Sequence, residues 1–555
     1  MARITRNWVV IWALVVGLIW ICYIQFTNTG IFDLSSIEPS SKSKLILDFE
    51  KTIKLSETLL NENKKLRTLL ETKISNLDKD PASWNKELID NGKYSSDHDM
   101  LLKKILQSTK EMTYYVKSEL KKQNASEATM KDGLSRVISL EVDAQKLYED
   151  GSPWRKQELK KMTQFIQSKI YHLQNPEDCS KAKFAECDLN KGCGFGCQIH
   201  HVAYCFYMAF GMGRTLVLAK DGKTWRYSPK GWDSTFLPIS KCDYDTHLSK
   251  KKTITWSGGR WTRESDAIVL IPIVDYVSPR PDFLPLALPK QIAGKLIELH
   301  SFPTAYFTGN IIQYAMRPNK QFSDIFDNML KGVPFGETPI VGIHVRRTDK
   351  IGTEANFHPA KEYMSEVEEW FTRQELLQGQ VLPRKVFVAT DDASVIAEIR
   401  SNYENYKVYG DESIASHAKV SSRYEEESLH GIIKDIRFLS KCNYIVGTFS
   451  SQVSRIAYEL MQLENEDDGG RNARSIDDVY YFGGQQEHNL IAIQDEKSNE
   501  AGHITFKKGD LIGIAGNHWD GYSKGTLRTG SYQEGLFPSY KVEEKWKEID
   551  MEMFN

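Results

Sequence analysis

Two adjacent arginines follow a short apolar segment in the middle of the chain. The heptapeptide HVRRTDK occupies residues 344–350, directly after an apolar run, and four of its seven side chains are charged. A sheet interior does not tolerate that many charges, so the heptapeptide should lie where a buried strand ends. The planar guanidinium of arginine matches phosphate oxygens, and one of Arg346 and Arg347 can reach a ligand while the other braces the site. The motif predicts a phosphate-binding site; the alternative is a surface cluster of ion pairs.

The segments around this motif alternate between apolar strands and helices. Buried strands are predicted at residues 340–345, 385–390, 406–409 and 444–448, with helices at 360–377, from 393 and at 427–440. This alternation is typical of a doubly wound parallel sheet, which binds ligands at the carboxyl ends of its strands. Earlier apolar runs at 215–218 and 267–271 predict two more buried strands. The fold class is therefore α/β.

The N-terminus has the pattern of a membrane anchor. Arg3 and Arg6 precede an apolar run at residues 8–26, about 19 residues, which is long enough to cross a bilayer. A cleaved signal peptide would be shorter and would end in a small-residue cleavage site. Because the positive charges precede the run, the short tail should be cytoplasmic and the rest of the chain lumenal.

Helical segments separate this anchor from the α/β region. Leu55, Leu59, Leu66 and Leu69 keep a helical spacing within residues 41–77, which predicts a coiled coil through which the chain self-associates. The alternative is a helix that packs on its own domain. A second helical region is predicted from Asp97 to Leu173, and short strands and turns from His488 onward.

Composition and cysteine usage fit a folded protein of an oxidising compartment. The chain has 555 residues, 41% of them hydrophobic, and a formal net charge of −2, which does not suggest a nucleic-acid partner. Six of the eight cysteines lie at positions 179–242, which predicts a disulfide framework whose pairing the spacing leaves open. Asn124-Ala125-Ser126 is a glycosylation sequon, as a lumenal stem could carry.

Two possible metal sites have better explanations. Cys193, Cys197, His200 and His201 could bind zinc, but in an oxidising lumen a disulfide between the two cysteines is favoured. The Asp-Tyr-Asp motif at residues 243–245 has the form of a metal–nucleotide site, yet it does not follow a buried strand. We therefore expect neither a metal nor a cofactor.

Several motifs in the same order resemble those of the α-1,6-fucosyltransferase family. They are CGFGCQIHH at 193–201, VGIHVRRTDK at 341–350, GTE at 352–354, ATDD at 389–392 and TFSSQV at 448–453. The resemblance covers essentially the whole chain. It implies a GT-B-like catalytic region with a Rossmann-type donor domain, a coiled-coil stem and an SH3-like β-barrel. The implied divisions are 1–7 cytoplasmic tail, 8–26 anchor, 27–174 stem, 175–330 open α/β subdomain, 331–487 donor domain and 488–548 SH3-like domain.

The resemblance also implies a reaction, namely transfer of L-fucose from GDP-β-L-fucose to the 6-hydroxyl of the innermost GlcNAc of N-glycans, with inversion. Arg346 would stabilise the charge left on the β-phosphate, Glu354 would be the general base, and Lys350 would position it or share the proton. The implied donor contacts are His344, Arg346, Arg347, Tyr227, Asp391, Asp392, Asp435, Ser451 and Gln452. The implied acceptor contacts are Lys191, Asp275, Asp349, Lys350, Glu354, Gln452 and His518, and Tyr363 would support the site. For Asp391 and Asp392, a helix N-cap is an equally good explanation.

Disulfides Cys179–Cys242, Cys187–Cys205 and Cys193–Cys197 are implied as well, with Cys442 as a buried thiol. Where the family can carry one further bridge, this chain has Gly447 and Ser454.

In the C-terminal region, residues 535–540 (GLFPSY) resemble an SH3 domain, but the aromatic groove that binds proline-rich peptides is altered. The resemblance therefore implies a structural role and a glycan contact through His518.

The implied setting is the Golgi membrane, where a type II, homodimeric enzyme would act on N-glycoproteins. Two alternatives remain at this point. One is a related fucosyltransferase with another acceptor, such as a protein hydroxyl. The other is a membrane-tethered SH3 binding protein without catalytic activity.

Overall fold

The structure, a computed structural model, describes residues 96–555 except 190, 229, 349–355, 419–423 and 531. The chain divides into two compact units, residues 1–76 and 77–555, and every described residue belongs to the second. The predicted anchor, the coiled coil at 41–77 and the site residues Asp349, Lys350 and Glu354 lie outside the described residues. Among the helices that are described, none has the length and apolar character to cross a membrane.

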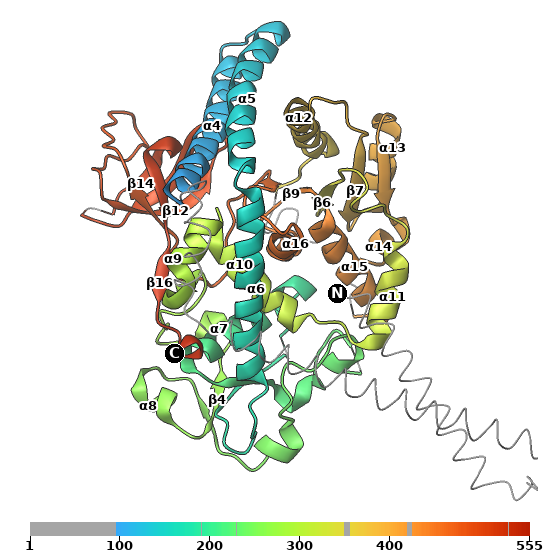
Figure 1. The fold of residues 1–555 in the computed structure, drawn as a ribbon, viewed down its shortest axis with the longest axis vertical. Coiled ribbons are helices and arrows are strands. Elements are labelled where there is room, and N and C mark those ends of the chain that lie inside the picture. Colours follow the sequence, from blue (N-terminus) through green and yellow to red (C-terminus); the bar gives the residue numbers. More distant parts are fainter. Residues whose placement is uncertain (1–95, 190, 229, 349–355, 419–423, 531) are drawn as a thin grey trace, which may run out of the picture. The chain divides into compact units, whose positions relative to one another are not determined.

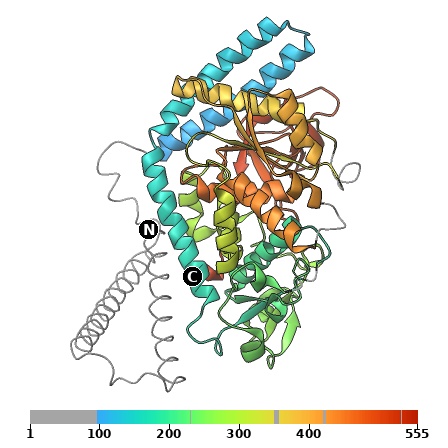
Figure 2. The ribbon, with the colours of Figure 1, turned by 90° about the vertical axis from the view of Figure 1, so that its right-hand side faces the viewer.

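The predicted helical region from Asp97 to Leu173 is helical but is divided into three helices. These are α4 (Ser96–Lys122), α5 (Glu127–Glu149) and α6 (Ser152–Gln174). Ser126 caps α5 by accepting a hydrogen bond from the backbone N–H of Thr129, and a proline in the first turn opens α6. Helices α4 and α5 form a hairpin, and α12 (Ala360–Gln378) packs beside α5 (Figures 1 and 2). The helical region thus contacts the α/β region directly.

The first sheet has four parallel strands in the order β2-β1-β4-β3. They are β1 (Phe184–Cys187), β2 (Thr215–Leu218), β3 (Thr253–Thr255) and β4 (Ile268–Ile271). The accompanying helices are α7 (Phe195–Met212), α8 (Gly259–Glu264), α9 (Lys290–Leu299), α10 (Pro303–Ala315) and α11 (Lys320–Leu330). All three expected disulfides are present here, Cys179–Cys242, Cys187–Cys205 and Cys193–Cys197. Cys197 and Cys205 lie on α7, so two of the bridges fix this helix to β1 and to the loop before it, and the third joins two loop positions.

The second sheet has five parallel strands in the order β10-β9-β6-β7-β8, as a doubly wound sheet requires. The strands are β6 (Val341–Val345), β7 (Lys385–Thr390), β8 (Lys407–Gly410), β9 (Tyr444–Gly447) and β10 (Ala473–Ser475). Helices α13 (Ala393–Asn402), α14 (Glu412–His417), α15 (Glu426–Lys441) and α16 (Gln452–Glu464) connect them together with α12. The predicted strands agree with this sheet to within a residue or two at each end.

Each central strand buries both of its faces, which explains its unbroken apolar sequence. On β7, Val386 and Val388 join a core with α12 and α13, whereas Phe387 and Ala389 join the larger core on the opposite side with α15. Side chains alternate along a strand, so a sheet that is covered by helices on both sides needs apolar residues at every position. Helices on both faces of the sheet therefore account for both its parallel topology and its unbroken apolar pattern.

The C-terminal strands form an antiparallel sheet in the order β14-β13-β12-β11-β15. They are β11 (Asn489–Ala492), β12 (Leu511–Asn517), β13 (Tyr522–Leu527), β14 (Glu534–Pro538) and β15 (Val542–Lys545). After them, β16 (Lys547–Ile549) pairs in parallel with β5 (Ala287–Pro289). Short helical turns complete the chain, namely η3 (Ala219–Gly222), η4 (Trp232–Ser234), η5 (Tyr244–Leu248), η6 (Val274–Tyr276), η7 (Ser539–Lys541) and η8 (Glu552–Phe554). The strand pattern predicted after His488 is present, and its SH3-like character stays a prediction.

Candidate active site

The strand order of the second sheet identifies where a ligand crevice should form. The chain runs from β6 to β7 and β8 on one side, and later returns on the other side of β6 with β9 and β10. The connections after β6 and β9 therefore leave the sheet in opposite directions, and sheets with such a switch point bind ligands at the carboxyl ends of these strands. HVRRTDK begins at the end of β6, and the TFSSQV motif begins just after β9.

His344 and Ser454 join the two sides of this switch point. His344 is 4% exposed at the end of β6, and its Nδ1 lies 2.7 Å from Oγ of Ser454 on α16. A Cβ on Gly447 would approach the Ser454 hydroxyl to 2.8 Å, so glycine leaves room for this hydrogen bond. Ser454 thus makes a polar contact across the switch point.

Asp391, at the end of β7, organises the loop after β6. Its carboxylate accepts hydrogen bonds from the backbone N–H of Arg347 at 2.8 Å, the N–H of Thr348 at 3.0 Å and the Thr348 hydroxyl at 2.5 Å. Nη1 of Arg346 forms an ion pair with it at 3.2 Å. Asp391 is 5% exposed, so these donors compensate for the burial of its charge. The carboxylate thus fixes both the loop and the Arg346 side chain.

The two adjacent arginines have different surroundings. Nη1 of Arg347 lies 3.4 Å from Glu398 and 3.8 Å from Asp392, both near α13, and the guanidinium stacks on Phe357 at 4.7 Å. Arg347 therefore braces the loop against α13. Asp392 is the N-cap of α13, because its side chain accepts from the Ser394 N–H at 3.0 Å. Arg347 and Asp392 therefore both contact α13, whereas Arg346 pairs with Asp391 at the end of β7.

Two helix N-termini meet on the β9 side of the switch point. Helix α16 begins after Ser451, whose side chain makes no cap hydrogen bond, and α7 begins after Gly194, which has no side chain to cap it. A Cβ on Gly196 would come within 2.9 Å of Cβ of Gln452, so the first turns of the two helices are in contact. Unpaired backbone N–H groups and the helix dipoles make such ends favourable for anions. This is a suitable place for a diphosphate.

The turn between β9 and α16 is held from the chain that follows β10. The backbone N–H of Phe449 donates to Oδ1 of Asp477 at 2.8 Å and to Oγ of Ser475 at 3.0 Å. The backbone N–H of Ser450 also points to Asp477, at 3.4 Å. Sequence reasoning missed Ser475 and Asp477, although polar residues directly after a short strand are a usable signal. It also missed the contact that Ser454 makes.

Tyr227 and Asp435, two further residues of the predicted donor site, lie in buried surroundings. The Tyr227 hydroxyl donates to the carbonyl of Cys193 at 3.4 Å, and its ring stands edge-on to Phe195 at the start of α7. Asp435 lies on α15, and burial raises the pKa of its carboxyl to about 8. Tyr227 therefore supports the N-terminus of α7. Burial favours the protonated form of the Asp435 carboxyl, and hydrogen-bond donors close to it would favour its ionised form.

The predicted acceptor residues come from separate elements. Burial lowers the pKa of Lys191, and the negative charge of Asp275 on η6 partly opposes this shift. The side-chain oxygen of Gln452 is buried without a hydrogen-bond partner among the described residues. His518 is exposed in the loop between β12 and β13. Tyr363 is buried on α12, where the nearby charges are those of Asp477, Arg347, Glu362 and Asp391.

The geometry speaks against the two metal motifs. Cys193 and Cys197 are joined in a disulfide, and His200 pairs with Glu459 at 2.9 Å. Among the described residues, the one group with metal-ligand spacing is Cys187, His201 and Cys205, and its two cysteines are also disulfide-bonded. Asp243 caps the turn η5 through the Thr246 N–H. Cys442 is a buried free thiol, as predicted.

Comparison with known proteins gives a consistent result. The family model for the alpha-(1,6)-fucosyltransferase N- and catalytic domains matches residues 1–481. An alpha-(1,6)-fucosyltransferase of Caenorhabditis elegans is 44% identical over 443 residues, which cover 80% of this chain and 78% of the relative. One of Drosophila melanogaster is 43% identical over 392 residues, 71% of this chain and 61% of the relative. The solved fucosyltransferase NodZ from Bradyrhizobium has 18% identity, a TM-score of 0.30 and coverage of 50% of this chain and 92% of its own.

Proposed function

The chain belongs to the alpha-(1,6)-fucosyltransferase family, and from this premise we propose that it moves L-fucose from GDP-β-L-fucose to the 6-hydroxyl of the innermost GlcNAc of N-glycans. The observation that carries the proposal is the position of Arg346. It follows β6 and is held by Asp391 at the end of β7, and the α7 and α16 termini meet on the β9 side of the same switch point. We further propose a GT-B-like catalytic region for the pair of parallel sheets.

On the donor side, Arg346 and the two helix termini would bind the diphosphate of GDP-fucose. Cleavage of the sugar–phosphate bond leaves negative charge on the β-phosphate, and a guanidinium held in place beforehand stabilises that charge without reorganisation. Charged hydrogen bonds of this kind contribute about 1.5–3 kcal/mol each. Asp435 would accept from the N–H groups of guanine, whose donors favour its ionised form.

On the acceptor side, Glu354 would remove the proton of the attacking hydroxyl, with Lys350 beside it. Because the donor is β-linked and the product α-linked, a single displacement with inversion accounts for the stereochemistry. Lys191, Asp275, Asp349, Gln452 and His518 would hold the glycan. No metal enters this scheme, because Arg346 and the helix termini supply the positive charge.

The proposal extends to the setting of the enzyme. The apolar run at residues 8–26 would anchor it in the Golgi membrane as a type II protein, with the catalytic part in the lumen. The leucine pattern of residues 41–77 would form a homodimer through the stem. The C-terminal sheet would be an SH3-like domain that contributes His518 to glycan binding.

The test is a transfer assay with the purified full-length chain in detergent. The enzyme is incubated with GDP-fucose, EDTA and an Asn-linked biantennary glycan that ends in GlcNAc, and the product is analysed by mass and linkage. We expect one fucose on the innermost 6-hydroxyl, and a loss on the order of 10²–10³ in kcat for Arg346→Ala. Arg400→Ala is the matched control, because Arg400 is an exposed arginine on α13 that pairs with Glu412. It should retain wild-type activity.

Other outcomes of the assay would redirect the proposal. Binding of GDP-fucose without transfer would favour a different acceptor, such as a protein hydroxyl. Failure to bind GDP-fucose at all would favour a membrane-tethered binding protein without enzymatic activity. Transfer that disappears with EDTA would contradict the metal-free scheme.

A further inference from the structure

The loop between β12 and β13, residues 517–521, packs against the helical hairpin as well as against its own sheet. The amide nitrogen of Asn517 donates to Oε1 of Glu111 on α4 at 3.3 Å. The ring of Trp519 stands edge-on to Tyr114 with centroids 5.6 Å apart. A Cβ on Gly521 would lie 2.9 Å from Cβ of Tyr115, so α4 and the loop backbone are in close contact. His518 lies in the middle of this loop.

Arg474 on β10 contacts both the loop and helix α4. Its guanidinium carbon is 4.4 Å from the centroid of Tyr114 and 4.2 Å from that of Trp519. Nε of Arg474 forms an ion pair with Glu366 of α12 at 3.2 Å, and the residue is 8% exposed. A flat cation away from water thus contacts two rings while a carboxylate balances its charge. Cation–π contacts of this kind are strongest where water is excluded.

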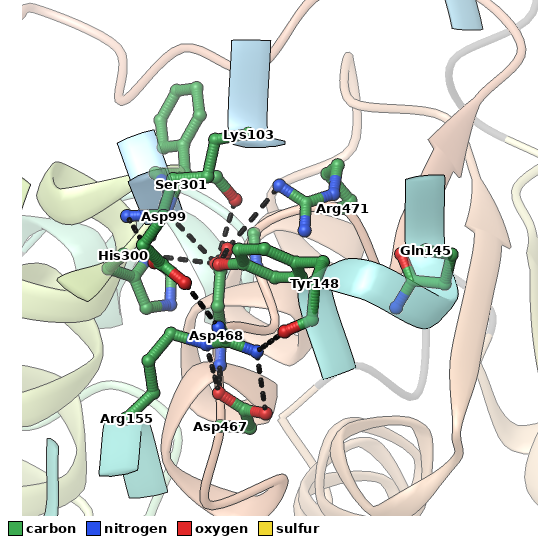
Figure 3. Close-up of polar contacts among 12 residues, drawn as sticks. Asp99, Lys103, Gln145, Tyr148, Arg155, His300, Ser301, Asp467, Asp468 and Arg471 are labelled. Carbon is green, nitrogen blue, oxygen red and sulfur yellow. Dashed lines mark hydrogen bonds and ion pairs between the residues drawn. The ribbon is translucent and has the colours of Figure 1, made fainter. Parts of the chain in front are cut away.

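The chain just before Arg474 contacts the next two helices of the helical region, α5 and α6. Asp468 accepts hydrogen bonds from the hydroxyl of Tyr148 on α5 at 2.6 Å and from the hydroxyl of Ser301 at 2.7 Å (Figure 3). Asp467 pairs with Arg155 of α6 at 2.9 Å, and Figure 3 shows Arg471 beside Tyr148 and Asp468. The helices α4 to α6 are therefore fixed to the segment at residues 467–474, not merely placed near it.

This segment also connects the two ends of the candidate site. Directly after Arg474, Ser475 and Asp477 hold the turn before α16. The next residue, Asp478, lies 3.8 Å from where a Cβ on Gly516 would be, just before the 517–521 loop. A shift of β10 would therefore displace the loop that carries His518.

We propose that Arg474 is a positioning residue for acceptor binding. Through its contacts with both Tyr114 and Trp519, it holds the 517–521 loop so that His518 faces the glycan, and it makes α4 a part of the acceptor site. This inference depends on the proposed function, because the acceptor is the N-glycan named there. Arg474 itself lies behind the loop and acts through it.

The side-chain shape explains why arginine is needed. Its broad, weakly hydrated guanidinium contacts both rings at once and still pairs through Nε with the Glu366 carboxylate. The lysine ammonium is a compact, strongly hydrated charge that cannot cover both rings in that way. Arg474→Lys therefore preserves the charge beside Glu366 and weakens the ring contacts, so it separates the effect of the ring contacts from the effect of the charge.

The first measurement needs no turnover. Hydrogen–deuterium exchange of full-length wild type and Arg474→Lys should show that amides of residues 517–522 exchange about tenfold faster in the variant, because the loop has lost a desolvated contact. The matched control is Arg384→Lys. Arg384 also stacks on a ring, Phe371 at 4.8 Å, and pairs with Glu368 and Glu375, away from the loop. It should leave the exchange of residues 517–522 unchanged.

The second measurement is the kinetic constants for the two substrates. Arg474→Lys should raise the glycan KM about tenfold and leave kcat and the GDP-fucose KM within about twofold of wild type. A variant weakened only in stability would lower the amount of active enzyme and leave both KM values unchanged. Combined with His518→Ala, Arg474→Lys should add little further increase in the glycan KM, because both changes remove one interaction. If Arg474→Lys does not fold, Trp519→Leu removes the same contact from the side of the loop.

The two measurements separate the possible failures. Unchanged exchange at residues 517–522 in Arg474→Lys would overturn the proposed contact. Faster exchange with an unchanged glycan KM would also overturn the proposal, since the loop would then not govern acceptor binding. If wild type neither transfers fucose to the glycan nor binds it, the proposed function fails and the inference fails with it. In that case the exchange data would still show whether Arg474 holds the loop.

Discussion

The proposed donor end of the site comes from one sheet, whereas the proposed acceptor end comes from elements that are far apart in the sequence. His344, Arg346, Asp391 and Ser451 all lie at or after the carboxyl ends of neighbouring strands of the second sheet. Lys191, Asp275 and His518 lie in a disulfide-rich loop, a short helical turn and a C-terminal loop. The topology of a parallel sheet brings strand ends together, but only packing between subdomains can align the acceptor residues. The two ends should therefore respond differently to substitution.

The largest expected effect is at the donor end. Asp391→Asn replaces a carboxylate that receives Arg346 and three hydrogen bonds by a neutral amide, so both the loop and Arg346 lose their fixed position. We expect a fall in kcat/KM for GDP-fucose on the order of 10² and a glycan KM close to wild type. Steady-state kinetics with each substrate varied in turn measure both effects.

Asp392→Asn is the matched control for this substitution. Asparagine caps a helix as well as aspartate does, and Asp392 caps α13. Its kinetics should stay near wild type. Equal losses in the two variants would show that the Asp391 contacts have no special role.

An intermediate effect concerns pH and Asp435. Burial raises the pKa of the Asp435 carboxyl to about 8 in the folded protein, whereas in the unfolded chain it is about 4. Between these pH values the folded protein holds a proton that the unfolded chain has released. This group therefore makes the fold less stable as pH rises from about 4 to 8, by at most about 1.4 kcal/mol per pH unit. Asp435→Asn should flatten that slope in urea unfolding curves taken at pH 5.5 and 7.5. The same slope in wild type and variant would contradict the assignment.

The smallest expected effect is at the acceptor end of the site. Gly521 has a φ of +94° and touches Tyr115, so Gly521→Ala should strain the loop by about 1–2 kcal/mol and press it away from α4. We expect a rise of about threefold in the glycan KM, with the GDP-fucose KM unchanged.

Gly509→Ala is the control for backbone strain alone. Gly509 has the same φ of +94° in the C-terminal sheet region, but no atom lies within 4 Å of an added Cβ. It should lose similar stability and keep a wild-type glycan KM. A raised KM in both variants would mean that strain in this region, and not contact with α4, controls acceptor binding.

Much of the second sheet was predictable from sequence because one physical pattern determines it. Strands buried on both faces need unbroken apolar runs, and β6, β7 and β9 have them. The site at the end of β6 was predictable for the same reason, since charges directly after such a run must leave the core. The Asp-Asp pair was ambiguous in sequence, and the structure separates it. Asp391 holds the loop of Arg346, and Asp392 caps a helix.

The sequence by itself determined the α/β class, the strand ends that carry the charged motif and the presence of disulfide bonds in the cysteine-rich region. These properties depend on residue type and local spacing, which can be read along the chain. Only the tertiary structure decided that Arg347 braces α13, that Ser454 bonds to His344 and that Arg474 contacts both Tyr114 and Trp519. Those partners are distant in sequence, and the strength of a charge or ring contact depends on which groups packing brings together and on how much water it excludes.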